Sequence, residues 1–338
     1  MNKNLFIKST LILILSGFLT KILGFIIKVI YTRIIGEYGI SLFTIATPTY
    51  SLLLTISTLA IPISISKLVS ENKGRSIRIL TSATFLILSI NFLLILLILL
   101  TKDFIAINLL KEPLASPILL AFSLTLPFVS ISSVLKGYFA GKQNMIPHAT
   151  SNIIEQIIRL IIIITVLPIL MKNSVMHAVL GLILLTILSE ISSIIVFLFF
   201  LPKHINYKTK LLPSKKHTKD ILDISLPTVS SRIIGNIGYF LEPIILTNLL
   251  LFSGYTNSYI LREYGAYNAY SLALLTMPGF FIAAISTSLL PEISKFHGER
   301  NSSMVKRRIK QSLLFALLIG TFFSFIIFTF RDKLLFTL

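Results

Sequence analysis

The sequence predicts an all-α polytopic membrane protein, with an internal parallel repeat of helices packed around a central cavity. Three observations support this fold class. The chain has 338 residues, of which 54% are hydrophobic and only 13% are charged. Its mean hydropathy of +0.89 lies far above the range of soluble globular proteins. Long apolar stretches recur from end to end, and a short fragment with a basic residue occurs twice.

The apolar stretches predict about nine transmembrane helices, since a spanning helix needs about 20 apolar residues. The Ile-rich run 161–164 could pass for a buried strand, but the stretch around it has the length of a helix. The expected helices cover residues 9–33, 40–68, 78–101, 115–140, 147–170, 176–201, 221–250, 265–290 and 309–330.

A repeated fragment relates the two parts of the chain. Lys21 lies three residues before a glycine in the first stretch, and Arg232 does so in the seventh. Burying a basic residue in the hydrocarbon core of a membrane costs free energy, and such residues usually have a function. Two of them at matching places predict a cationic site between related halves, as in transporters. In each copy Glu-Tyr-Gly and then Ile-Ser-Lys follow, at 37–39 and 65–67 and again at 263–265 and 293–295.

The formal net charge of +18 reflects an uneven distribution of Lys and Arg among the loops. Most of these residues lie in alternate loops, and the densest run is 203–219. The positive-inside rule then places the amino terminus in the cytoplasm. We expect anionic membrane lipid near the basic run. No nucleic acid is expected as a partner, because no basic motif interleaved with aromatic residues occurs.

Composition excludes several kinds of chemistry. The chain has no cysteine, and its five histidines are scattered without metal-ligand spacing. No Gly-rich phosphate loop ends in Gly-Lys-Ser/Thr. We therefore expect no metal, no cofactor and no ATPase. Lys3 and Lys8 precede the first apolar stretch as in a signal peptide, but a small-residue cleavage site is missing, so an uncleaved helix is expected.

The first expected helix carries a polar face. Gly17, Lys21, Gly24 and Lys28 follow one another at helical spacing and therefore share one side. We predict that Lys21 and Lys28 bind substrate in the cavity. In the alternative interpretation, each lysine extends to a membrane interface, which suits Lys28 better than Lys21 near mid-span.

The fifth and sixth expected helices carry acidic residues. Glu155 and Arg159 are spaced as an i, i+4 ion pair of the favourable orientation. Such a pair either belongs to the substrate site or holds the helices together, and the sequence leaves both open. Glu190 has no partner in its own segment, so we expect it to pair with one of the intramembrane cations.

The seventh expected helix is the most polar. Arg232, Asn236 and Glu242 lie along one side of it and are candidate substrate-binding residues. The planar guanidinium of Arg232 suits phosphate oxygens. Together with Lys21 it would bind a pyrophosphate. A purely structural pair of Arg232 with Glu242 is disfavoured, because ten residues correspond to about 15 Å of helix rise.

Several ordered segments identify a resemblance. The run 135–147, then Glu155-Gln156 with Arg159, the run 225–236 and Glu242-Pro243-Ile244 resemble the stage V sporulation protein B family. That family is related to lipid II flippases and polysaccharide exporters within the multidrug/oligosaccharidyl-lipid/polysaccharide exporter superfamily. The resemblance covers the whole chain, and Lys21 falls where the flippases place a cavity arginine. Lys28 matches no basic position there.

The resemblance implies two six-helix lobes around a V-shaped cavity, alternating access, and a lipid-linked sugar as substrate. The expected substrate is an undecaprenyl-pyrophosphate-linked sugar of spore cortex or cell-wall synthesis, moved across the cytoplasmic membrane. A monomeric transporter is expected, with cell-wall synthesis enzymes as candidate partners.

The family has more spanning helices than this chain. We expect a complete six-helix lobe at 1–201, a basic cytoplasmic linker at 202–219, and the first three helices of a second lobe at 220–338. The second lobe is thus expected to be incomplete, through truncation of the gene product or because the sequence is a fragment.

Two other function classes are considered. A multidrug/cation antiporter of the same superfamily would be expected to line its cavity with acidic residues, which the cations here disfavour. A membrane-embedded glycan enzyme would need a catalytic carboxylate or a large external loop. The longest expected outer loop, 251–264, is short.

Overall fold

The structure, a computed structural model, describes residues 3–71, 76–201, 213–276, 278–279, 282, 293 and 301–337. Throughout these ranges the regular elements are helices, as the hydropathy predicted. The helices α1 to α6 are Lys3–Thr58, Ile61–Glu71, Ser76–Asp103, Ala115–Gly141, Ile146–Asn173 and Val175–Phe200, with a π-helical turn at Phe104–Leu109 after α3. The later helices are α7 at Lys215–Phe252, α8 at Asn257–Ala266, a π-helical turn at Tyr267–Ser271, α9 at Leu272–Thr276 and α11 at Ser302–Thr337.

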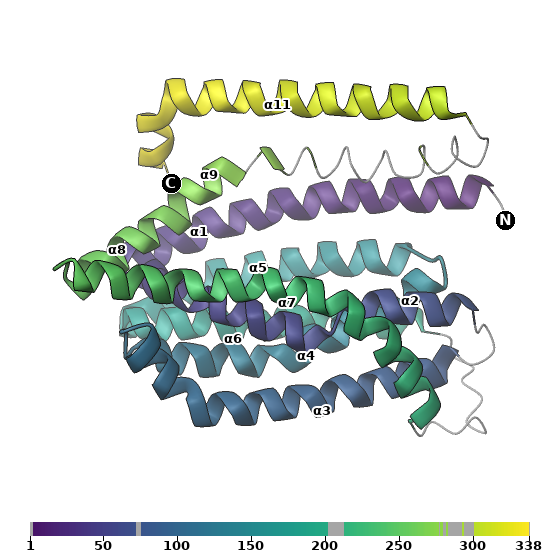
Figure 1. The fold of residues 1–338 in the computed structure, drawn as a ribbon, viewed down its shortest axis with the longest axis horizontal. Coiled ribbons are helices and arrows are strands. Elements are labelled where there is room, and N and C mark those ends of the chain that lie inside the picture. Colours follow the sequence, from purple (N-terminus) through teal and green to yellow (C-terminus); the bar gives the residue numbers. More distant parts are fainter. Residues whose placement is uncertain are drawn as a thin grey trace.

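Helix α1 bends sharply at Gly36, where two expected helices meet. Gly36 has φ 75° and ψ 177°, a conformation that only glycine adopts readily. The chain reverses here, and the second half of α1 runs back through the bundle beneath the first half (Figure 1). The expected loop between 33 and 40 is therefore reduced to this bend.

A second break separates α1 from α2. Leu59 and Ala60 have φ of 46° and 50°, which is uncommon for residues with a Cβ. Pro62 explains the position of the break. It has no N–H to donate to the carbonyl of Thr58, and its ring would clash with that carbonyl in a continuous helix.

Helix α4 lies at the centre of the first bundle, which we define as α1 to α6. A Cβ built on Gly137 would lie 2.8 Å from Pro62 Cα, and one built on Gly141 would lie 2.7 Å from the carbonyl oxygen of Ser66. These two glycines, four residues apart, therefore let the backbone of α2 lie directly on α4. The pair of helices encloses an apolar core that includes Ile65 and Tyr138.

The later helices are arranged along one side of the first bundle. Helix α7 runs the length of the bundle, and α8 lies beside the bend of α1 (Figure 1). Asn236 and Ser225 of α7 are hydrogen-bonded to side chains of α1 and α2, respectively. Helix α11 lies along the edge of the molecule, beyond the first half of α1 (Figure 1).

Within the described residues, seven helical segments are long and apolar enough to cross a membrane, where the sequence predicted nine. The first two expected helices form the single segment Leu15–Glu71, because the bend at Gly36 takes up no loop residues. Most of residues 277–290 in the expected helix 265–290 lie outside the described residues. Most of the linker 202–219, and Ser294 and Lys295 of the second Ile-Ser-Lys segment, also lie outside the described residues.

Candidate functional site

A polar cavity of about 470 Å³ opens between α1, α4, α5 and α9. Its lining is rich in cations and amides, which is unusual for side chains in the middle of apolar helices. The described lining residues are Thr20, Lys21, Gly24, Phe25 and Lys28 from α1, Lys136 from α4, Asn152, Glu155, Gln156 and Arg159 from α5, and Thr276 from α9.

The α1 side of the cavity is the polar face that the sequence predicted. Lys21 and Lys28 both line the cavity, and Gly24 between them faces Gln156 across it. The other side of this helix presents exposed apolar side chains, including Ile22 and Ile26. Lys28 Nζ approaches the carbonyl oxygen of Asn268 at 3.5 Å, so it contacts the helices that follow α7.

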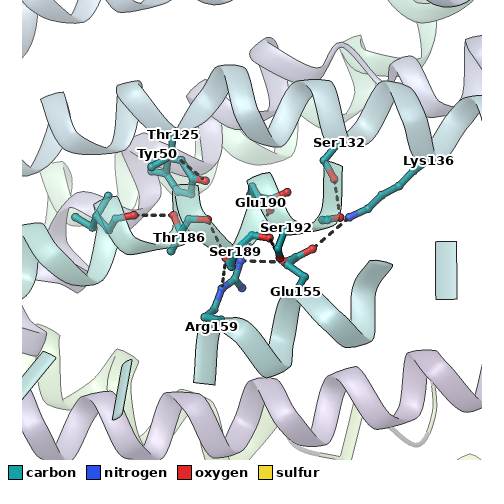
Figure 2. Close-up of polar contacts among 12 residues, drawn as sticks. Tyr50, Thr125, Ser132, Lys136, Glu155, Arg159, Thr186, Ser189, Glu190 and Ser192 are labelled. Atoms are coloured by element: carbon teal, nitrogen blue, oxygen red, sulfur yellow. Dashed lines mark hydrogen bonds and ion pairs between the residues drawn. The ribbon is translucent and has the colours of Figure 1, made fainter. Parts of the chain in front are cut away.

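The α5 side holds the ion pair that the sequence predicted. Arg159 Nη2 donates to Glu155 Oε1 at 2.9 Å, which is the i, i+4 contact expected from their spacing. Arg159 also reaches α6, where its Nε donates to Ser189 Oγ at 3.1 Å. Figure 2 shows its guanidinium between Glu155 and the serines of α6. The pair therefore links α5 to α6 as well as facing the cavity.

Glu190 of α6 lies behind this ion pair. Its Oε1 is 3.8 Å from Arg159 Nη2, which confirms the prediction that Glu190 pairs with an intramembrane cation. Only 6% of the residue is exposed, and its Oε2 has no hydrogen-bond partner in the described structure. Arg159 thus compensates two buried carboxylates at once.

Lys136 is a further residue of the cavity that was not predicted as a site residue. It lies within α4, inside the expected helix 115–140, and its Nζ is 3.7 Å from Glu155 Oε2. The long, flexible lysine stem lets the ammonium group reach the cavity from near the helix end. The available signal was a lysine inside the expected helix 115–140.

The three candidate residues of α7 lie apart from the described lining of this cavity. Asn236 Oδ1 accepts a hydrogen bond from Ser51 Oγ at 2.8 Å, and Asn236 Nδ2 donates to the carbonyl of Arg232. Asn236 thus lies in the contact between α7 and α1. Arg232 is exposed and Glu242 half-buried, and neither forms an ion pair with a described residue.

A second, smaller cavity of about 290 Å³ lies at the Gly36 end of the molecule. Arg262 of α8 donates from Nε to Glu37 Oε1 of α1 at 2.7 Å, so the two copies of the Glu-Tyr-Gly segment lie close together. Asn257 donates to the carbonyl of Lys111 at 2.8 Å. Burial raises the pKa of the Glu112 carboxyl, while a hydrogen bond from the N–H of Leu114 opposes the rise.

The chemistry of the larger cavity favours an anionic ligand. Four cationic side chains and a single carboxylate line it. In a low-dielectric setting such an excess attracts anions much more strongly than it would in water. No group of His, Asp and Glu able to hold a metal ion occurs among the residues searched in the described structure.

Comparisons with known proteins identify similar chains. The family model described as polysaccharide biosynthesis protein matches residues 6–297. Stage V sporulation protein B of Bacillus subtilis (strain 168) is 34% identical over 347 residues, covering 99% of this chain and 67% of that protein. The lipid II flippase MurJ of the same organism is 26% identical over 179 residues, covering 49% of this chain and 33% of that protein.

The fold also matches a solved structure. An inward-facing multidrug resistance MATE family transporter of the MOP superfamily aligns with a TM-score of 0.70 at 14% identity, covering 93% of this chain and 71% of that one. At this identity the likeness shows a shared fold.

Proposed function

Because the chain belongs to the polysaccharide biosynthesis protein family, we propose that it moves an anionic lipid-linked sugar across the cytoplasmic membrane by alternating access. It is a multi-pass membrane protein of transporter fold. The substrate class we propose is an undecaprenyl-pyrophosphate-linked sugar used in spore cortex or cell-wall synthesis. The named activity of the lipid II flippase relative supports this class.

The observation that carries the proposal is the cationic cavity between α1, α4 and α5. A pyrophosphate needs cations in a site shielded from water, and Lys21 and Lys28 supply them from one face of α1. Asn152, Gln156 and Thr20 add neutral hydrogen-bonding groups that suit sugar hydroxyls. The isoprenoid tail would remain in lipid along the exposed apolar side of α1.

The transport cycle we propose moves two lobes against each other. Residues 1–201 form the first lobe, 202–219 the cytoplasmic linker and 220–338 helices of the second lobe. Lys21 and Arg232, at matching places of the repeat, would bind the pyrophosphate from the two lobes when these close on it. Binding stabilises one orientation of the lobes, and release after rocking completes the transfer.

A cation antiporter is the second candidate, since the matched transporter fold also serves multidrug transport. The cavity argues against it, because cationic drugs would meet Lys21, Lys28 and Lys136 with one carboxylate to offset them. A glycan enzyme is disfavoured, because two of the matched proteins are named as a flippase and as a transporter.

The function is tested by reconstituting the chain in liposomes with a fluorescent polyprenyl-pyrophosphate sugar and measuring its access to an impermeant quencher. We expect transport that is lost in Lys21→Ala and Arg232→Ala, kept in Lys21→Arg, and unaffected in the matched control Lys142→Ala outside the cavity. Wild-type transport by the Lys21→Ala/Arg232→Ala double variant would return both residues to a structural role. Uptake of a cationic dye with no movement of the lipid would favour the antiporter.

The proposed orientation has a separate test. With the amino terminus in the cytoplasm, Ser214 before α7 faces inward and Ser253 after α7 faces outward. In this cysteine-free chain, Ser253→Cys should react with an impermeant thiol reagent in intact cells, and Ser214→Cys should resist it. The opposite labelling pattern would reverse the assignment.

A further inference from the structure

Lys136 has free hydrogen-bonding capacity that faces the cavity. Its side chain is 25% exposed, and its ammonium group carries three N–H donors. In the described part of the chain, Nζ makes no hydrogen bond, and its nearest ionic contact is Glu155 Oε2 at 3.7 Å. That distance allows electrostatic attraction but exceeds the range of an N–H···O hydrogen bond.

Glu155 holds its two cationic neighbours in different ways. Its Oε1 accepts a hydrogen bond from Arg159 at 2.9 Å, whereas its Oε2 only lies near Lys136. Figure 2 shows the two cations approaching the carboxylate from different sides and from different helices. The contact with Lys136 is thus the looser of the two and the easier to exchange.

Arg159, by contrast, already contacts other side chains of the protein. Its guanidinium is bonded to Glu155 and Ser189 and lies 3.8 Å from Glu190. Removing it from these partners would leave Glu190 without an ion-pair partner among the described residues and Glu155 with only its looser contact to Lys136, at a high cost in free energy. Arg159 therefore joins α5 to α6, and Lys136 remains to bind an anion.

We propose that Lys136 is an anion-binding residue of the cavity and that Glu155 is its counter-ion in the empty state. When a pyrophosphate enters, a phosphate oxygen replaces Glu155 Oε2 as the partner of the Lys136 ammonium. Glu155 keeps its bond to Arg159 throughout. This inference rests on the proposed function, to which it adds a residue and an exchange of partners.

The exchange has two physical consequences. In the empty cavity, Glu155 lowers the electrostatic cost of keeping Lys136 near Lys21 and Lys28. It also competes with the substrate for Lys136 and so weakens binding, which favours release after transfer. Lys136 reaches the cavity from α4 and the other two lysines from α1, so a bound pyrophosphate would be contacted from opposite walls.

The test uses the full chain in detergent with farnesyl pyrophosphate as the probe and farnesol as the uncharged control, measured by calorimetry. Lys136→Gln should weaken probe binding about tenfold or more, as for the loss of one charge-assisted hydrogen bond. The matched control Lys142→Gln, on the exposed end of the same α4 region, should bind as wild type does. Glu155→Gln should tighten binding, and this gain should vanish when Lys136→Gln is also present.

A measurement on the wild-type chain does not depend on the folding of any variant. Acylation of lysines by an amine-reactive reagent, read by mass spectrometry, should fall several-fold at Lys136 when inorganic pyrophosphate is added. Acylation of Lys142 should not change.

Three outcomes separate the possible failures. If wild type binds the probe and Lys136→Gln binds as tightly as Lys142→Gln, the exchange is wrong while the proposed function stands. If a folded Glu155→Gln variant weakens binding as much as Lys136→Gln does, Glu155 is a ligand and its counter-ion role is wrong. If wild type binds farnesyl pyrophosphate no more tightly than farnesol, both the exchange and the proposed substrate class are overturned.

Discussion

The interior of the first bundle and the contact between α1 and α8 both contain a short Arg–Glu pair, but in different surroundings. Arg159 and Glu155 have side chains that are 23% and 8% exposed, whereas those of Arg262 and Glu37 are 67% and 48% exposed. The first pair also has Glu190 and Ser189 as neighbours, and the second contact is a simple pair. Equal geometry therefore does not mean equal contribution to stability.

The difference fits two mechanical roles. Buried charges that compensate one another resist separation, since each would be left without a partner in a low dielectric. An exposed pair can separate at little cost because water replaces the partner. The buried pair thus holds the helices of the first bundle together, whereas the exposed pair adds little to the contact of α1 with α8, which also contains the buried side chains of Leu261 and Tyr264.

The largest effect is expected from breaking the buried network. Arg159→Leu leaves Glu190 without its cation and Glu155 with only the looser contact to Lys136, and it should destabilise the fold by about 3 to 5 kcal/mol. Adding Glu155→Gln to Arg159→Leu should recover part of this loss. Unfolding in detergent, followed by far-UV circular dichroism, measures the stability of the single and the double variant. A double variant no more stable than either single one would show that the pairing has no structural role.

A smaller effect is expected from the close contact of α2 with α4. A Cβ at Gly137 would lie 2.8 Å from Pro62 Cα and 2.9 Å from the Pro62 carbonyl oxygen, so the backbones must move apart. We expect Gly137→Ala to destabilise by about 1 to 3 kcal/mol. Gly235→Ala in α7 is the matched control, because no described atom lies within 4 Å of a Cβ built there. Equal stability of the two variants would contradict the packing.

The smallest effect is expected from the exposed pair. Separating Glu37 from Arg262 by Arg262→Gln should cost about 0.2 to 1 kcal/mol at low salt and less as salt screens the pair. The same denaturation assay at two salt concentrations measures it. A loss comparable to that of Arg159→Leu would remove the distinction between the two regions.

Much of this architecture was predictable from local sequence. Hydropathy identified the membrane class and the helical stretches, since burial in lipid forces each segment to satisfy its own backbone. The Glu155–Arg159 contact followed from a spacing of four residues on one helix. The polar face of Lys21 and Lys28 followed from the same periodicity. These predictions concern neighbours within one helix, whose geometry is fixed.

The errors lie where the path of the chain changes. The bend at Gly36 falls between the expected helices 9–33 and 40–68, but the break at Leu59 and Ala60 divides a stretch that hydropathy predicted as one helix. Hydropathy averages over many residues and is insensitive to a proline within an apolar run. Lys136 lies inside the expected helix 115–140, but its contact with Glu155 depends on how α4 packs against α5, which a profile along the chain does not contain.

The sequence by itself determined that this protein is a helical, multi-pass membrane protein with cations on the inward faces of its helices. Only the tertiary structure decided which of those charges meet. Lys136 approaches Glu155 from α4, and Glu190 approaches Arg159 from α6, while Arg232 stays outside the described cavity lining. The physical reason is that periodicity fixes the face on which a side chain lies, whereas its partner on another helix depends on how the helices pack, including the close contact at Gly137.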